Sequence, residues 1–329
     1  MWRKLYSYYK ACKIEFIDYN SLEVASLFSK INPKATLISI VALLVVTLVI
    51  HVMPGLAIIL ACFSLIPGIV LWYQSKHSFG LVALIAIILS TLTGNVFVMT
   101  FLIIILVLSM VISQLLIQRA SKERILYLTT FVASVLTLSA MMILQTLKKI
   151  PYADDLLQPY RAIMHQAAEL ENLDQQAQEI LNNSIQQLAI QLPGMIVVAI
   201  AIYVFITLLI IFPILRKFKV ATPVFRPLFF WQMKRSVFIM YALALLTTIT
   251  TQPATTPNSI GINFQIVLGF LLVIQGLSFI HFFASIKRMP GALKVILVIV
   301  GVLFYPMTRL IGLLDLGLNL KRMIKNDKR

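Results

Sequence analysis

Long runs of apolar residues alternate with short polar turns along most of this chain. Five runs follow one another between residues 35 and 147, and a further group lies between residues 192 and 320. Several of them approach the roughly 20 residues that a helix needs to cross the hydrocarbon core of a bilayer. The pattern predicts an all-α fold, a polytopic transmembrane helical bundle with about eight or nine membrane segments.

Two stretches depart from this pattern. In residues 1–34, apolar and aromatic residues recur at spacings of three and four with lysines between them. This predicts an amphipathic tail in the membrane interface, its lysines towards anionic lipid headgroups, or alternatively a solvated tail. Residues 148–191 are acidic, rich in Gln, and carry a near seven-residue apolar repeat. They predict an extracytoplasmic insertion of two amphipathic helices that break near Asn182-Asn183.

Composition and charge settle the class of protein. The chain is 60% hydrophobic and 12% charged, which excludes a soluble domain of this length. Its net charge of +16 comes from basic residues clustered in turns between apolar runs, the pattern of cytoplasmic loops. We therefore expect a cytoplasmic N-terminus and contact with anionic lipids. We do not expect nucleic acid as a partner.

The last apolar stretch conflicts with this charge pattern unless it is interrupted. If Val295–Leu318 crossed the membrane once, the basic tail at residues 321–329 would lie outside the cytoplasm. A break at Tyr305-Pro306 would let the chain turn back and keep this tail cytoplasmic. We expect a broken or re-entrant final element with a cavity nearby, since interrupted backbone at membrane depth must be satisfied by protein or water.

Polar residues within the last two apolar segments are the candidate ligand-binding residues, because such groups are costly in hydrocarbon. Arg309 and Asp315 are six residues apart, so a direct pair requires a bend, which Gly312 could permit. The structural alternative places Asp315 at the cytoplasmic interface. A buried Gln most often bonds a neighbouring helix, and a His near a basic loop suits the interface. The candidates are Gln275, His281, Arg309, Asp315 and Asn319.

Catalytic and metal-binding patterns are missing from the sequence. The four histidines lie in separate segments without metal-ligand spacing, and no phosphate-binding loop or GxSxG motif occurs. We expect no enzymatic activity, no metal and no cofactor.

Two short runs suggest a family. Val273-Ile274-Gln275-Gly276-Leu277 and Leu310-Ile311-Gly312-Leu313-Leu314-Asp315, followed by basic residues, resemble the YybS-like family. Its members are predicted bacterial inner-membrane proteins with a domain of unknown function. The resemblance implies a multi-pass protein of the bacterial inner (cytoplasmic) membrane. The family also looks similar in helical layout to the substrate-binding membrane subunits of energy-coupling-factor transporters. That similarity implies capture of a small molecule, with energy supplied by separate partner subunits.

Two functions remain open at this stage. The first is a component that binds or helps transport a small-molecule ligand between the last two segments, with residues 148–191 as a lid. The second is a non-transporting scaffold that recruits a protein partner through the basic loop at 216–235 or the insertion at 148–191. A polar cavity converging on Gln275, Arg309 and Asp315 would favour the first. A solid apolar core with those side chains at the headgroup level would favour the second.

Overall fold

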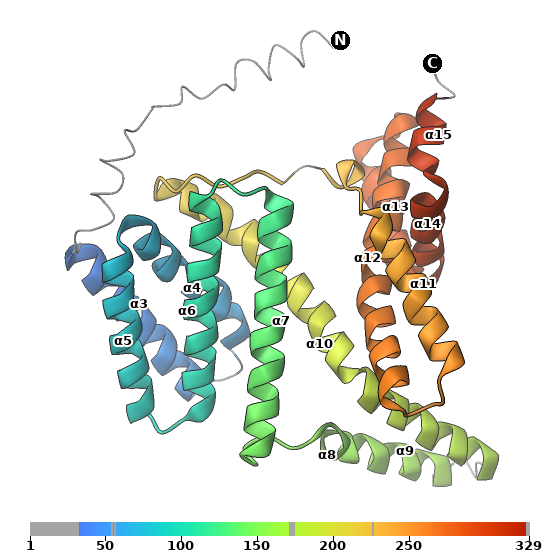
Figure 1. Cartoon of the computed structure of the whole chain (residues 1–329), viewed down its shortest axis with the longest axis horizontal. Coiled ribbons are helices and arrows are strands. Elements are labelled where there is room, and N and C mark those ends of the chain that lie inside the picture. The colour runs from blue at the N-terminus through green and yellow to red at the C-terminus, as the bar shows by residue number, and fades with distance from the viewer. Residues whose placement is uncertain (1–32, 54, 56, 171–174, 226, 327–329) are drawn as a thin grey trace. The chain divides into compact units, whose positions relative to one another are not determined.

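Every regular element that the structure describes is a helix, as the apolar pattern predicts (Figure 1). This computed structural model describes residues 33–53, 55, 57–170, 175–225 and 227–326. All but the last two residues of the predicted amphipathic tail at 1–34 lie outside these ranges.

The apolar runs form helices of two lengths. Four helices are long and apolar enough to cross a membrane, and a bent pair could form a fifth crossing. The long helices are α6 (Val96–Ile117), α7 (Lys122–Thr146), α10 (Gln175–Lys217) and α12 (Thr256–Ile286). The shorter apolar helices are α3 (Pro33–Val52), α4 (Ala57–Gln74), α5 (Lys76–Leu92) and α11 (Arg235–Thr250). The structure thus supports four or five crossings, while the larger count of eight or nine stays a prediction.

The final apolar stretch is broken, which confirms that prediction. Helices α13 (Gly291–Leu303) and α14 (Tyr305–Leu318) are bent by 103° about Phe304. Phe304 has φ −94° and ψ 47°, outside the helical range. Pro306 follows in the first turn of α14, where its missing N–H costs no helical hydrogen bond. The local sequence therefore starts a new helix here instead of continuing the old one.

The predicted break at Asn182-Asn183 is wrong. After the short helix α8 (Ala153–Leu156) and α9 (Gln158–Leu170), helix α10 begins at Gln175 and runs through both asparagines to Lys217. Asn is only mildly unfavourable inside a helix, and neither Gly nor Pro adjoins this pair. The amphipathic segment is therefore continuous with the apolar one.

The chain divides into two compact units. The first comprises Met1–Ala120 and Ile211–Thr222, and it contains α3 to α6. The side chains of Ser75 and Asn95 accept backbone N–H bonds from the first turns of α5 and α6. They therefore mark where these two helices begin. Its core consists of Leu43, Leu71, Phe79, Val82, Ala86, Leu102 and Leu106.

The second unit comprises Ser121–Ile210 and Pro223–Arg329. Helix α12 packs against α11, α13, α14 and the short 3₁₀ turn η2 (Leu228–Phe230), and α15 (Leu320–Asn326) follows α14. Figure 1 shows α11, α12, α13 and α14 side by side. The core consists of Met233, Tyr241, Ala244, Leu268, Leu272 and Leu316.

Candidate functional site

A buried polar network lies where α12, α14 and α15 meet. The fully buried Asp315 carboxylate accepts a hydrogen bond from Gln275 Nε2 at 2.5 Å and another from the backbone N–H of Lys321 at 3.0 Å. Gln275 is itself fully buried, and its Oε1 accepts the backbone N–H of Met233 at 2.8 Å. Both oxygens of the carboxylate and both ends of the amide therefore have partners, as burial in an apolar surrounding demands.

Glycines permit this network by letting α12 and α14 touch. A Cβ added at Gly276 would overlap the carbonyl of Thr308, and one added at Gly312 would overlap the carbonyl of Leu272. Such backbone contact between membrane helices requires residues without side chains. It brings Gln275, beside Gly276, within reach of α14.

The end of α14 brings Lys321 back to Asp315. Asn319 adopts the left-handed conformation with φ 59°, and its N–H donates to the carbonyl of Asp315 at 2.9 Å. This cap reverses the chain, so that the N–H of Lys321 reaches the Asp315 carboxylate. A short C-terminal turn thus completes the network.

The Lys321 ammonium group lies almost entirely out of solvent. Its Nζ donates to the carbonyl of Trp231 and to the Ser278 hydroxyl, both at 2.7 Å. Burial lowers the pKa of Lys321 from 10.5 to about 8, and the Asp315 carboxylate opposes that shift. The cation is therefore held by directed hydrogen bonds and one nearby carboxylate.

The same network fixes the backbone of the loop that precedes α11. Ser278 Oγ lies 2.7 Å from the carbonyl oxygens of both Leu228 and Trp231. The Met233 N–H donates to Gln275, and Lys321 donates to the Trp231 carbonyl, so that together these contacts anchor three loop residues. The side chains of Leu228, Trp231 and Met233 line a large cavity in the same unit. The buried network therefore positions one wall of that cavity.

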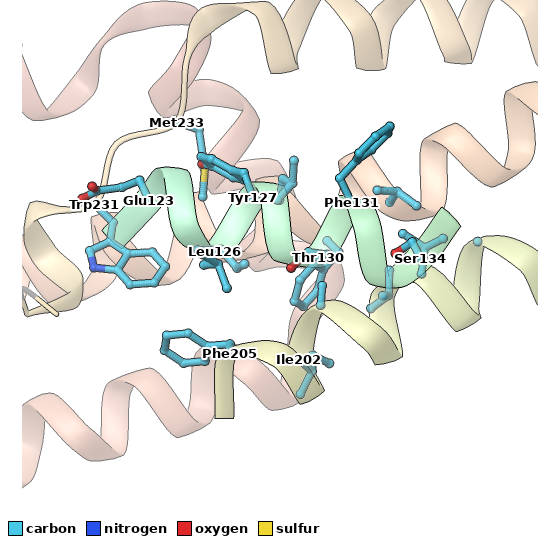
Figure 2. Close-up of a pocket in the computed structure, with 18 of the residues that line it drawn as sticks. Glu123, Leu126, Tyr127, Thr130, Phe131, Ser134, Ile202, Phe205, Trp231 and Met233 are labelled. Carbon is cyan, nitrogen blue, oxygen red and sulfur yellow. The ribbon is translucent and has the colours of Figure 1, made fainter. Parts of the chain in front are cut away.

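The cavity has a volume of about 880 Å³ and lies between α7, α10, α12 and this loop (Figure 2). Its surface is almost wholly apolar and aromatic. The rings of Phe225 and Trp231 each meet Phe205 edge to face at a centroid distance of 5.6 Å. Further lining residues include Leu126, Tyr127, Phe131, Leu138, Val198, Ile202, Phe264, Val267, Phe270 and Ile274.

Polar groups mark different parts of the cavity lining. Near the start of α7, Lys122 Nζ lies 3.7 Å from Glu123 Oε1 and 3.5 Å from the carbonyl of Val224. On α10 and α12, Gly194 and Asn263 also line the cavity. The rest of the lining, apart from Lys122, Glu123, Gly194 and Asn263, is predominantly apolar.

Asn263 joins α12 to α10 by bonding two backbone groups of α10 that lie one turn apart. Its Oδ1 accepts the Gly194 N–H at 2.6 Å, while its Nδ2 donates to the Ile190 carbonyl at 2.8 Å. In an uninterrupted helix those two backbone groups would bond each other. The amide therefore bonds both backbone groups beside Pro193, where α10 is continuous.

The five residues predicted to bind a ligand do not converge on this cavity, and none of them lines it. Gln275 and Asp315 are brought together, but they bond each other. Arg309 is half-buried, with its side chain beside Gly269. His281 packs its ring perpendicular to Phe229 at 5.3 Å, and Asn319 accepts a hydrogen bond from Gln232 at 3.4 Å. Asp315, which the alternative interpretation places at the cytoplasmic interface, is fully buried near the end of α14 and accepts the backbone N–H of Lys321.

Sequence reasoning missed the cavity residues. Aromatic residues such as Phe225 and Trp231 beside a basic loop are typical of headgroup anchors, and the aromatic residues of α7 and α10 look like ordinary membrane-helix residues. One local signal existed: Thr130 and Ser134 lie four residues apart on α7, and both line the cavity. Their shared face on an otherwise apolar helix could have indicated a polar contact.

Comparison with known sequences places the chain in a family. The profile of the family described as "Predicted membrane protein (DUF2232)" matches residues 39–316. The chain belongs to this family. It is also 34% identical over 137 residues to the "Uncharacterized protein YybS" of Bacillus subtilis (strain 168), a match that covers 40% of this chain and 44% of that protein. The match thus spans less than half of that relative's length. No solved structure matches the chain.

The YybS relationship and the family match agree with the resemblance seen in the Gln275 and Asp315 segments. Both descriptions leave the activity undefined, and the family description states only a predicted membrane protein.

Proposed function

We propose that this DUF2232 protein binds an apolar or amphipathic small molecule in the cavity between α7, α10 and α12. The observation that carries the proposal is the cavity itself. Its volume of about 880 Å³ lies within the range of small-molecule sites, roughly 300–1,000 Å³. A strongly polar ligand would lose its hydration without gaining enough hydrogen bonds from this lining. A ligand with a large apolar part matches it.

The ligand would enter from the bilayer. Several cavity-lining residues are exposed, so the cavity is open: Phe131 is 66% exposed, Phe264 51% and Ile202 43%. In a membrane this surface meets lipid tails, so an apolar molecule can reach the cavity without crossing water. The protein would serve as a binding component. The expected layout similarity to energy-coupling-factor subunits would then imply that separate partners supply the energy for transport.

A pair of substitutions on α10 tests this function. Ile202→Trp adds bulk to the cavity lining, whereas Ile206→Trp adds the same bulk to an exposed position outside it. We expect molecules retained by the purified full chain in mild detergent, detected by native mass spectrometry, to be lost from Ile202→Trp alone. The Ile206→Trp variant should match the natural protein. Equal retention by both variants would contradict the proposal and favour the non-transporting scaffold.

A further inference from the structure

Helix α9 exposes one apolar face. Tyr160 is 45% exposed and Ile163 64%, although an amphipathic helix normally buries its apolar stripe. Arg161, His165 and Gln166 lie on the other sides of the helix. An exposed stripe of this kind calls for an apolar surface to cover it. The residues of this face recur at spacings of three and four: Tyr160, Ile163, Met164 and Ala167.

Helix α7 brings the chain to the membrane surface just before this segment. Residues 125–147 carry no charged side chain, whereas Lys122 and Arg124 precede them and Lys148 and Lys149 follow. The 25 residues of α7 span about 38 Å, slightly more than the roughly 30 Å of the hydrocarbon core. The charged residues at its two ends therefore lie at the level of the lipid headgroups.

The turn after α7 keeps the chain at that level. Lys148 adopts the left-handed conformation with φ 53°, and the Lys149 N–H donates to the Leu144 carbonyl at 2.9 Å, which caps the helix. Gln145 Nε2 donates to the Pro151 carbonyl at 3.5 Å and so ties the turn to the end of α7. Figure 1 shows α8 and α9 running across the end of α7. A helix with this direction at headgroup level lies along the membrane surface.

Exposed apolar side chains also follow the chain from α7 into α9. Ile143 near the end of α7 is exposed, as are Tyr152 before α8 and Leu156 at its end. On a membrane-crossing helix such residues meet lipid. The bilayer is therefore the nearest apolar surface for the residues that come next.

We propose that α8 and α9 lie in the headgroup region of the leaflet that α7 reaches at Lys148, with Tyr160 and Ile163 towards the acyl chains. The surface that covers this face is the bilayer itself. Tyrosine suits this level because its ring is apolar and its hydroxyl prefers water. Since α7 already holds the segment at the surface, a small apolar face is sufficient. The segment fixes the depth of the end of α7, as interfacial anchors do.

Spin labels measure this placement. In the full chain with Cys12→Ser and Cys62→Ser, a nitroxide is attached at Ile163→Cys or at Gln166→Cys, and each protein is reconstituted into phospholipid vesicles. Oxygen concentrates in the acyl region, whereas a water-soluble nickel complex is excluded from it. We expect the ratio of oxygen to nickel collisions to be several-fold higher at position 163 than at position 166. Ile206→Cys, exposed on the apolar part of α10, provides the value for a lipid-facing label.

Two results would overturn the proposal. Equal ratios at positions 163 and 166 would show that α9 has no face turned to lipid. Low collision rates with both reagents at position 163 would show that protein covers this face, as a lid or a partner would. Both labelled positions are exposed, so neither substitution removes a buried contact. The proposal does not involve the cavity, and the function proposed above stands or falls separately.

Discussion

At the scale of single residues, four amide side chains of α12 each have their own hydrogen-bond partners. Asn258 donates to the Thr248 carbonyl, and Gln265 donates to the Thr248 hydroxyl, which joins α11 to α12. Asn263 hydrogen-bonds α10, and Gln275 hydrogen-bonds Asp315 of α14 and Met233 of the loop. Each partner removes the cost of a polar group in an apolar surrounding. These four amides therefore determine which segments pack against α12.

Lys321 predicts a pH dependence of stability. The folded-state pKa of about 8 lies below the ordinary value of 10.5, so between these values the unfolded chain binds more protons. The free energy of unfolding should therefore rise as pH increases from about 8 to 10.5, by up to about 3 kcal/mol. Below pH 8 the Lys321 amine is charged in the folded protein, so the free energy of unfolding is reduced by the full cost of burying that charge. Thermal unfolding of the natural protein and of Lys321→Gln, compared across this range, measures the difference.

In the Lys321→Gln variant that rise should be absent, because Gln does not titrate. Arg322→Gln, which alters the exposed neighbouring cation, should retain it. Parallel pH profiles for the natural protein and Lys321→Gln would show that Lys321 is solvated in solution.

At the scale of helices, the α12–α14 interface depends on backbone contact. Gly276 and Gly312 each face a carbonyl of the opposite helix, and Thr308 donates from α14 to the Gly301 carbonyl of α13 at 2.6 Å. The bend at Phe304 is therefore held by packing on both of its arms. Since the Gln275–Asp315 bond requires this close approach, the interface also determines the position of the loop that lines the cavity.

Gly312→Ala is expected to destabilise the second unit, because the new methyl group would overlap the Leu272 carbonyl and push the helices apart. Overpacking of this kind costs about 1–3 kcal/mol, with backbone contacts at the upper end. The matched control is Gly317→Ala on the same helix, where the added Cβ would meet Phe238 at an ordinary 3.6 Å. Thermal melting in detergent compares the two variants. A control variant that melts as early as Gly312→Ala would contradict the proposed contact.

At the scale of the whole molecule, the path of the bent pair α13–α14 determines on which side of the membrane the residues after α14 lie. A bend of 103° within an apolar stretch suits either a broken crossing or a re-entrant element. The basic residues on both sides of the pair favour the re-entrant form, since both flanks then lie in the cytoplasm. Helix α12 precedes the pair, and the uncharged loop before α12 then lies on the opposite side.

Cysteine labelling tests this topology. In a background with Cys12→Ser and Cys62→Ser, a single cysteine is placed at Arg288, Arg322 or Gln252. We expect an impermeant thiol reagent applied from outside the cell to label Gln252→Cys only. Arg288→Cys and Arg322→Cys should react once the membrane is opened. Labelling of Arg322→Cys from outside would show that the final pair crosses the membrane.

Local features of the fold were predictable from sequence, and non-local ones were not. The break before Pro306 was predictable because proline acts on its own backbone and on the preceding turn. The contacts that α10 makes beside Pro193 were not, because they come from Asn263, 70 residues further along the chain. Gln275 and Asp315 were recognised as unusual, but their mutual bond depends on glycine contacts between two helices.

By itself, the sequence determined a membrane protein of apolar helices with an interrupted final segment, because hydrophobicity and helix breaking are properties of residues and their immediate neighbours. Only the tertiary structure decided which polar groups meet and where the large cavity lies. Those outcomes depend on how closely helices distant in sequence approach one another, and that distance is set by packing across many side chains at once. The candidate site therefore lies along α7, α10 and α12, beside the residues that the sequence singled out.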